Sequence, residues 1–96
     1  MIKIGTIEKQ IKKVEEVDVS FVQNGINVRS DARIDAANYK YERKLKNSAT
    51  VSQLKKRLRT QYPGYDFDIK EASGEVVKRG HKHIGTVRDT YISEEE

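Results

Sequence analysis

Two histidines, His81 and His83, are the residues best suited to metal or acid–base chemistry. They stand two residues apart, so a strand would place both side chains on one face. A zinc site takes four ligands, or three and a water, and the nearest carboxylates, Glu75 and Asp89, show no ligand spacing. The chain has no Cys, and no Ser or Thr stands in a nucleophile motif. We therefore predict that the protein is not an enzyme and has no catalytic residues, no metal and no cofactor.

A pair of carboxylates, Asp66 and Asp68, also shares one face of a predicted strand. Paired carboxylates act as acid and base only in a cleft that perturbs their pKa values. We interpret this pair as the solvated side of an amphipathic strand. The glycines form neither of the common phosphate-loop patterns and are interpreted as turn residues.

The strongest chemical signal is a run of positive charge from Arg43 to Tyr65. This run contains seven basic residues and no Asp or Glu. A helix selected only for solubility pairs Glu with Lys four residues apart, whereas Lys55 and Arg59 carry like charges at that spacing. Such a feature lowers local helix stability and therefore indicates a function.

Helical geometry defines which of these charges share a face. At 100° per residue, Lys55, Arg59 and Lys56 lie about 100°, 140° and 200° from the apolar Leu54. Arg57 lies on the other side of the helix. A second basic group, which includes His81 and His83, either extends this face or stands apart. The predicted nucleic-acid-binding residues are Lys55, Lys56, Arg59, Lys44, Lys46, Lys78, Arg79 and Lys82.

Clustered Lys and Arg bind nucleic acid by displacing counterions from phosphates, which gives salt-sensitive affinity without base readout. We therefore predict a small basic binding module with nucleic acid as its partner. The alternative is a protein-interaction module, an adaptor or inhibitor, which docks on an acidic partner surface or by strand addition. Four tyrosines could stack on bases or belong to the core, namely Tyr39, Tyr41, Tyr62 and Tyr65. They occur in phase with the apolar residues of the predicted strands, which favours the core.

Two helices are predicted. Residues 50–62 form the main one, with Thr50 and Gln53 spaced as a capping box and Pro63-Gly64 ending it in a turn. An N-terminal helix is predicted over residues 6–16. Its apolar residues Ile7, Ile11 and Val14 follow each other at spacings of four and three, and Thr6 is its predicted N-cap.

Strands are predicted where apolar and polar residues alternate. Within residues 17–30, alternating runs at 17–21 and 26–29 lie on either side of Asn24-Gly25, which is the usual signal of a two-residue hairpin turn. Further strands are predicted over 37–45 and 65–70, with 31–36 as a loop and Ser73-Gly74 turning the chain into Val76 and Val77. Residues 84–92 fit either a short helix that begins near Thr86 or a last edge strand.

The predicted fold class is α+β: an antiparallel sheet of four to five strands with the 50–62 helix packed on one face. The element order is similar to that of the double-stranded RNA-binding domain, but that family's Gly-rich turn and its Lys-Lys-x-Ala-Lys helix start are missing, so no family is assigned. A ubiquitin-like β-grasp around residues 50–58 lacks confirming motifs as well.

Size and composition limit the remaining possibilities. The chain has 96 residues, of which 35% are hydrophobic and 35% charged, with a net charge of +4. This length predicts one domain, residues 1–92, followed by a disordered acidic tail, residues 93–96. No apolar stretch approaches the roughly 20 residues that span a bilayer, and no secretory h-region is visible. The lack of Cys is typical of a reducing compartment, so a cytoplasmic location is expected.

Overall fold

The structure, a computed structural model, describes residues 1–93. Its first helix, α1 (Ile4–Glu15), buries Ile4, Ile7, Ile11 and Glu15 along one face. The helix begins before the predicted cap Thr6 because the loop after the first hairpin caps it instead. The amides of Ile4 and Gly5 donate to carbonyls of residues 32 and 30, both at 2.8 Å.

The hairpin predicted around Asn24-Gly25 is confirmed. β2 (Asp18–Gln23) pairs with β3 (Ile26–Asn27), and the two turn residues have φ angles of 54° and 76°. Positive φ at both central positions is what this tight turn requires. On its other side β2 pairs antiparallel with β5 (Asp66–Lys70), in a register that places Phe21 opposite Phe67.

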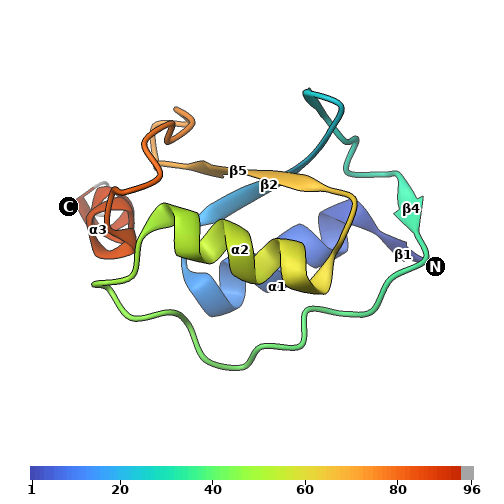
Figure 1. The fold of residues 1–96 in the computed structure, drawn as a ribbon, viewed down its shortest axis with the longest axis horizontal. Helices are drawn as coiled ribbons and strands as arrows, with labels where there is room; N and C mark the ends of the chain where they lie inside the picture. The colour runs from blue at the N-terminus through green and yellow to red at the C-terminus, as the bar shows by residue number, and fades with distance from the viewer. Residues whose placement is uncertain (94–96) are drawn as a thin grey trace.

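The sheet prediction is only roughly right. The described strands form two antiparallel sheets, β3-β2-β5 and a two-stranded pair of β1 (Ile2–Lys3) with β4 (Arg33–Ile34). Residues 1–93 contain three helices, whereas the sequence predicts one main helix and an N-terminal one. β4 lies inside the predicted 31–36 loop. α1 and α2 (Val51–Gln61) lie side by side under one face of β2 and β5 (Figure 1).

The predicted strand over 37–45 is wrong. This segment runs along the side of the two helices that faces away from the sheet (Figure 1). Side chains, not a neighbouring strand, satisfy its amides: Tyr39 N–H donates to Gln10 Oε1 at 3.0 Å and Lys40 N–H to Gln61 Oε1 at 3.1 Å. Apolar and polar residues still alternate along this segment because Tyr39, Tyr41 and Leu45 pack on the core.

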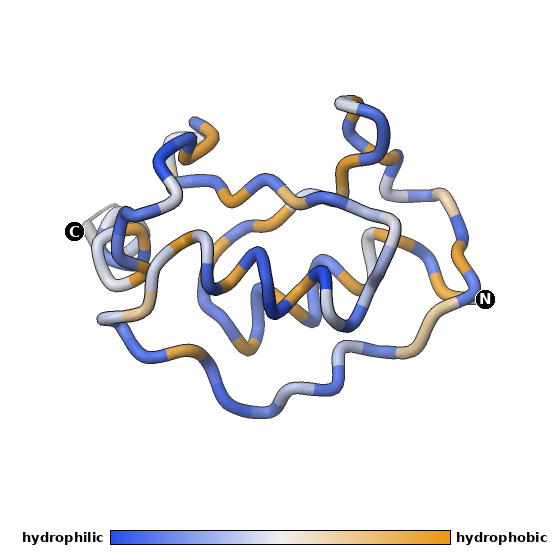
Figure 2. Tube along the Cα trace, in the orientation of Figure 1, coloured by the Kyte–Doolittle hydropathy of each residue, from blue (hydrophilic) through white to orange (hydrophobic). Residues whose placement is uncertain are grey.

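The main helix forms as predicted. Thr50 is the N-cap of α2, and both hydrogen bonds of its capping box with Gln53 are present. Val51, Leu54 and Leu58 are buried, and Gly64 has the positive φ of 92° expected at the turn after the helix. Figure 2 shows these hydrophobic residues recurring along α2 between polar ones.

The uncertain region 84–92 forms a helix, α3 (Ile84–Ser93), so its edge-strand alternative is wrong. The starts of α2 and α3 cap each other: Val51 N–H donates to Lys82 O at 2.8 Å, and Ile84 N–H to Ala49 O at 2.7 Å. The Ser73-Gly74 turn is present, although the chain beyond it meets β5 through a single bridge at Val76. Ser93 ends α3, and the rest of the predicted tail lies outside the described residues.

Gly85 allows α3 to approach the segment before α2. A Cβ added at Gly85 would lie 2.7 Å from Asn47 Cβ and 3.1 Å from Asn47 O. Although Ala normally stabilises a helix by up to about 1 kcal/mol over Gly, we expect Gly85→Ala to lower the free energy of unfolding by about 1–3 kcal/mol. Urea denaturation tests this, with Thr86→Ala on the exposed neighbouring position as the control. An unchanged or higher stability of the Gly85 variant would contradict the close contact.

Candidate functional site

The outward face of α2 carries the predicted cluster of positive charge. Ser52, Lys55, Lys56 and Arg59 follow each other at helical spacing, and burial of the opposite face turns them toward solvent. Ser52, Lys56 and Arg59 are exposed, and Lys55 is half-buried. A single rigid helix therefore fixes these side chains relative to one another.

The second basic group lies against the N-terminal end of this face. Ser52 N–H donates to Gly80 O at 2.8 Å. A Cβ at Gly80 would lie 2.1 Å from Ser52 Oγ, so the loop approaches the helix as closely as a glycine permits. The sequence left open whether the two groups join, and the structure brings them together. We call their cationic residues the basic stripe: Lys55, Lys56, Arg59, Lys78, Arg79 and Lys82.

The loop end of the basic stripe is concave. A cleft of about 500 Å³ lies between the loop and the start of α3, and every residue that lines it has a side chain able to donate a hydrogen bond. The lining residues are Arg79, His81, Lys82, His83 and Thr86.

Acidic residues from outside the acid-free run neutralise part of the predicted site. Arg59 Nε lies 3.3 Å from Asp66 Oδ1, and Lys82 Nζ lies 2.6 Å from Glu71 Oε1. The Arg59 pair is more than half exposed at both side chains, so its contribution to stability is small and a phosphate can replace the carboxylate. Within residues 1–93, four members of the basic stripe form no ion pair: Lys55, Lys56, Lys78 and Arg79.

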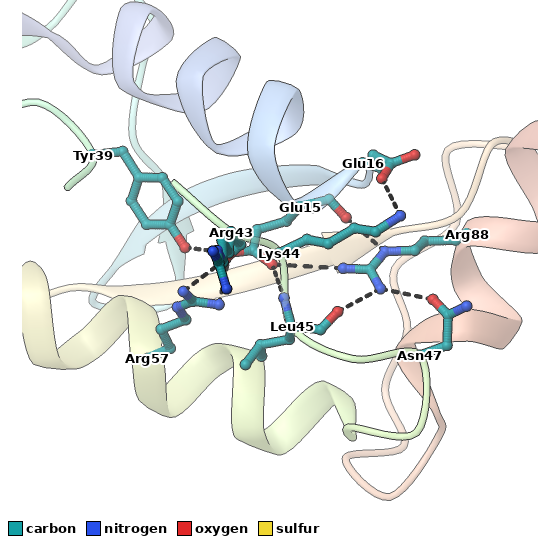
Figure 3. Close-up of polar contacts among 9 residues, drawn as sticks. All are labelled: Glu15, Glu16, Tyr39, Arg43, Lys44, Leu45, Asn47, Arg57 and Arg88. Atoms are coloured by element: carbon teal, nitrogen blue, oxygen red, sulfur yellow. Dashed lines mark hydrogen bonds and ion pairs between the residues drawn. The ribbon is translucent and has the colours of Figure 1, made fainter. Parts of the chain in front are cut away.

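The two predicted site residues before α2 do not join the basic stripe. Lys44 lies beside the end of α1, where its ammonium contacts Glu16 Oε2 at 2.5 Å (Figure 3). This contact holds the pKa of the Glu16 carboxyl below its usual value. Lys46 is exposed, and among the described residues no side-chain hydrogen bond or ion pair joins it to the basic stripe. The basic stripe therefore contains six of the eight residues that the sequence singles out.

Arg57 points into the protein, not toward solvent, and meets the buried carboxylate of Glu15. Arg57 Nη1 lies 3.2 Å from Glu15 Oε2, and Glu15 is 0% exposed. The Tyr39 hydroxyl donates to the same oxygen at 2.6 Å, and the Leu45 amide donates to Oε1 at 3.0 Å (Figure 3). Arg88 on α3 is the fourth partner, with its Nη2 atom 3.6 Å from Glu15 Oε1. Four groups thus surround one buried negative charge.

Arg88 extends this cluster to α3. Its guanidinium donates to the backbone carbonyls of Glu15 and Leu45 at 2.8 and 2.7 Å, and to Asn47 Oδ1 at 2.8 Å. Burial lowers the pKa of Arg88, and the negative charge of Glu15 opposes that effect. The cluster therefore ties the 37–47 segment to all three helices, and its visible role is structural.

Sequence reasoning missed Glu15 as a core residue, because the predicted apolar stripe of the 6–16 helix contains only Ile7, Ile11 and Val14. The signal was present, because Glu15 follows Ile11 by four residues and so continues the buried stripe of α1. A carboxylate at such a position needs buried cationic or hydrogen-bonding partners. Those partners come from segments distant in sequence, which the pattern of α1 does not identify.

The core interpretation of the tyrosines is confirmed. Tyr39 and Tyr62 are 9% and 2% exposed, and Tyr41 and Tyr65 pack against the core as half-buried side chains. Phe21 contacts the rings of both Tyr62 and Tyr65 edge-on, with ring centroids 5.3 and 5.4 Å apart. These rings support the fold.

Burial of Tyr62 predicts a loss of stability in alkali. Its phenol pKa rises from 10.0 to about 12, so the fold favours the neutral form. The contribution of the neutral Tyr62 phenol to the free energy of unfolding is complete below pH 10 and is lost as the pH rises through about 12. We expect the free energy of unfolding in urea to fall more for the parent protein than for Tyr62→Phe between about pH 9 and 11. An equal fall in both would contradict the assignment.

The remaining candidates do not assemble into a site. No group of three or more His, Cys, Asp or Glu residues in the described part of the chain is arranged to hold a metal ion. Asp66 and Asp68 alternate with buried Phe67 and Ile69, as expected for the solvent side of the strand. In residues 1–93 no helix is long and apolar enough to cross a bilayer.

Comparison with protein-family models, with curated proteins and with solved structures finds no match to this chain. The function is therefore argued from the surface and its charges.

Proposed function

We propose that the protein is a small non-enzymatic module that binds nucleic acid through phosphate contacts made by the basic stripe. One observation carries the proposal. The outward face of α2 and the 78–82 loop, which are separate in sequence, meet at the Ser52–Gly80 contact, so the two groups of cationic residues belong to adjoining segments. The net charge of +4 favours the approach of a polyanion, and the lack of Cys is in keeping with a cytoplasmic protein.

The chemistry of the surface suits phosphate. Lysines that have no carboxylate partner provide charge without first breaking an ion pair. Hydroxyl groups add neutral donors of the kind that contact phosphate oxygens, here from Ser52 on α2 and Thr86 at the cleft.

The experiment is chromatography of the full chain on immobilised heparin and on immobilised DNA, with elution by salt. We expect retention on both, and a binding constant that falls with salt concentration by a slope of about 0.9 for each phosphate contact on duplex DNA. Passage through both columns at low salt would contradict the proposal.

A second candidate function, docking of a partner protein by strand addition, is favoured by the edge of β2. β3 pairs with β2 only at Val22 and Gln23. Beyond that pairing, Val28 N–H donates to Phe21 O at 2.8 Å, whereas the Phe21 amide donates to the Glu8 carboxylate at 3.0 Å. Over residues 18–20, no strand of the described residues pairs with this edge of β2. An extended peptide that displaces Glu8 would complete this edge. The measurement that separates the two functions is the location of binding, which is the basic stripe for nucleic acid and the edge of β2 for a peptide.

A further inference from the structure

The tyrosine and phenylalanine side chains of this protein are all engaged in the fold. The sequence contains five tyrosines and two phenylalanines, and all seven lie in the described region. Four are buried, namely Phe21, Phe67, Tyr39 and Tyr62. The other three are half-buried against the core, namely Tyr41, Tyr65 and Tyr91.

Each half-buried ring already has a partner. The Arg57 guanidinium lies 3.9 Å from the centroid of the Tyr41 ring. The Tyr91 hydroxyl joins the ends of two strands, because it accepts from the Asp18 amide at 2.9 Å and donates to the Lys70 carbonyl. Tyr65 contacts the buried Phe21 ring edge-on. Apart from the imidazoles of His81 and His83, which are exposed at the cleft, the described surface therefore has no free aromatic ring on which an unpaired base can stack.

This absence bears on which nucleic acid the basic stripe suits. Proteins that bind single strands combine a positive groove with aromatic rings, and each stacked base contributes a large part of the affinity. A duplex instead keeps its bases stacked inside and presents closely spaced phosphates on its outside. The basic stripe offers charges and hydrogen-bond donors on a rigid helix and a tightly held loop, which matches the outside of a duplex.

We infer that the ligand of the basic stripe is a nucleic-acid duplex, bound through its backbone and without regard to base sequence. This inference rests on the proposed function. Lys55, Lys56 and Lys78 contact phosphates, and Arg59 exchanges Asp66 for a phosphate when the duplex binds. No base-edge contact is needed.

The test is fluorescence anisotropy with labelled mixed-sequence duplexes of DNA and of RNA, each compared with its own separated strands of the same length. We expect at least one duplex to bind about tenfold more tightly than either of its strands. We also expect duplexes of unrelated sequence to bind within about twofold of each other.

Separated strands that bind as tightly as the duplexes would overturn the inference and leave the proposed function intact. A marked preference among duplex sequences would overturn it too. Failure of every duplex and every strand to bind at low salt would instead contradict the proposed function itself.

Discussion

Glu15→Gln is expected to lower the free energy of unfolding by about 3–5 kcal/mol, a large part of the total for a domain of this size. The substitution keeps the volume of the side chain and removes its charge. The guanidinium groups of Arg57 and Arg88, whose side chains are 15% and 6% exposed, then lose the carboxylate that compensates them. Burying cations without a counter-charge costs far more than losing an ion pair in water.

The neighbouring Glu16 provides a matched control. Its carboxylate also forms an ion pair, with Lys44, but both side chains are about half exposed. We expect Glu16→Gln to cost less than about 1 kcal/mol. Urea denaturation followed by circular dichroism measures both variants. Hydrogen exchange adds a local readout, because the Leu45 amide donates to Glu15 and should exchange faster in the Glu15 variant. Equal, small losses in the two variants would contradict the structural role of Glu15.

Reversal of the charges at Lys55 and Lys56 to Glu is expected to weaken duplex binding by about a hundredfold, at about 1.5 kcal/mol for each phosphate contact. These two lysines have no ion-pair partner in the described residues, so the change removes no ion pair seen in the fold. Arg59 is left in place because it is paired with Asp66. Anisotropy measurements at several salt concentrations give both the affinity and its salt dependence.

A control of equal charge separates a local contact from a general loss of positive charge. Lys9 and Lys13 on α1 are exposed and lie outside the basic stripe. The variant Lys9→Glu with Lys13→Glu lowers the net charge by the same amount as the α2 variant. We expect the α1 variant to lose no more than about fivefold in affinity, through weaker long-range attraction alone. Similar losses in both variants would mean that the basic stripe is not the binding surface.

The local elements of the fold were predictable because their signals are contained in a few neighbouring residues. Asn24-Gly25 adopts the positive φ angles that its turn needs, and Thr50 with Gln53 closes the capping box. Each signal depends on backbone geometry and hydrogen bonds within four residues. Such signals do not depend on what the rest of the chain does.

The error over residues 37–45 has a different origin. Alternation of apolar and polar residues reports that one side of an extended segment is buried, and it does not report what the segment pairs with. Here Gln10, Gln61 and Glu15 supply the acceptors that a neighbouring strand normally supplies. No property of the segment itself reveals these partners.

The candidate site was predictable in its α2 part and less so elsewhere. Helical periodicity correctly grouped Lys55, Lys56 and Arg59, since burial of Leu54 and Leu58 fixes the opposite face. The ion pair of Lys44 was not predictable because its partner, Glu16, is at the end of another helix. The junction of α2 with the 78–82 loop depends on the packing of α3. The sequence did not decide whether that segment, residues 84–92, is a helix or a strand.

Where a duplex binds can be mapped by titrating isotope-labelled protein with duplex DNA and following backbone amide shifts by NMR. If the basic stripe binds the duplex, the shifted amides belong to residues 52–59 and 78–83, and these shifts disappear as salt is added. Shifts confined to the exposed edge of β2, or to α1, would contradict binding by the basic stripe.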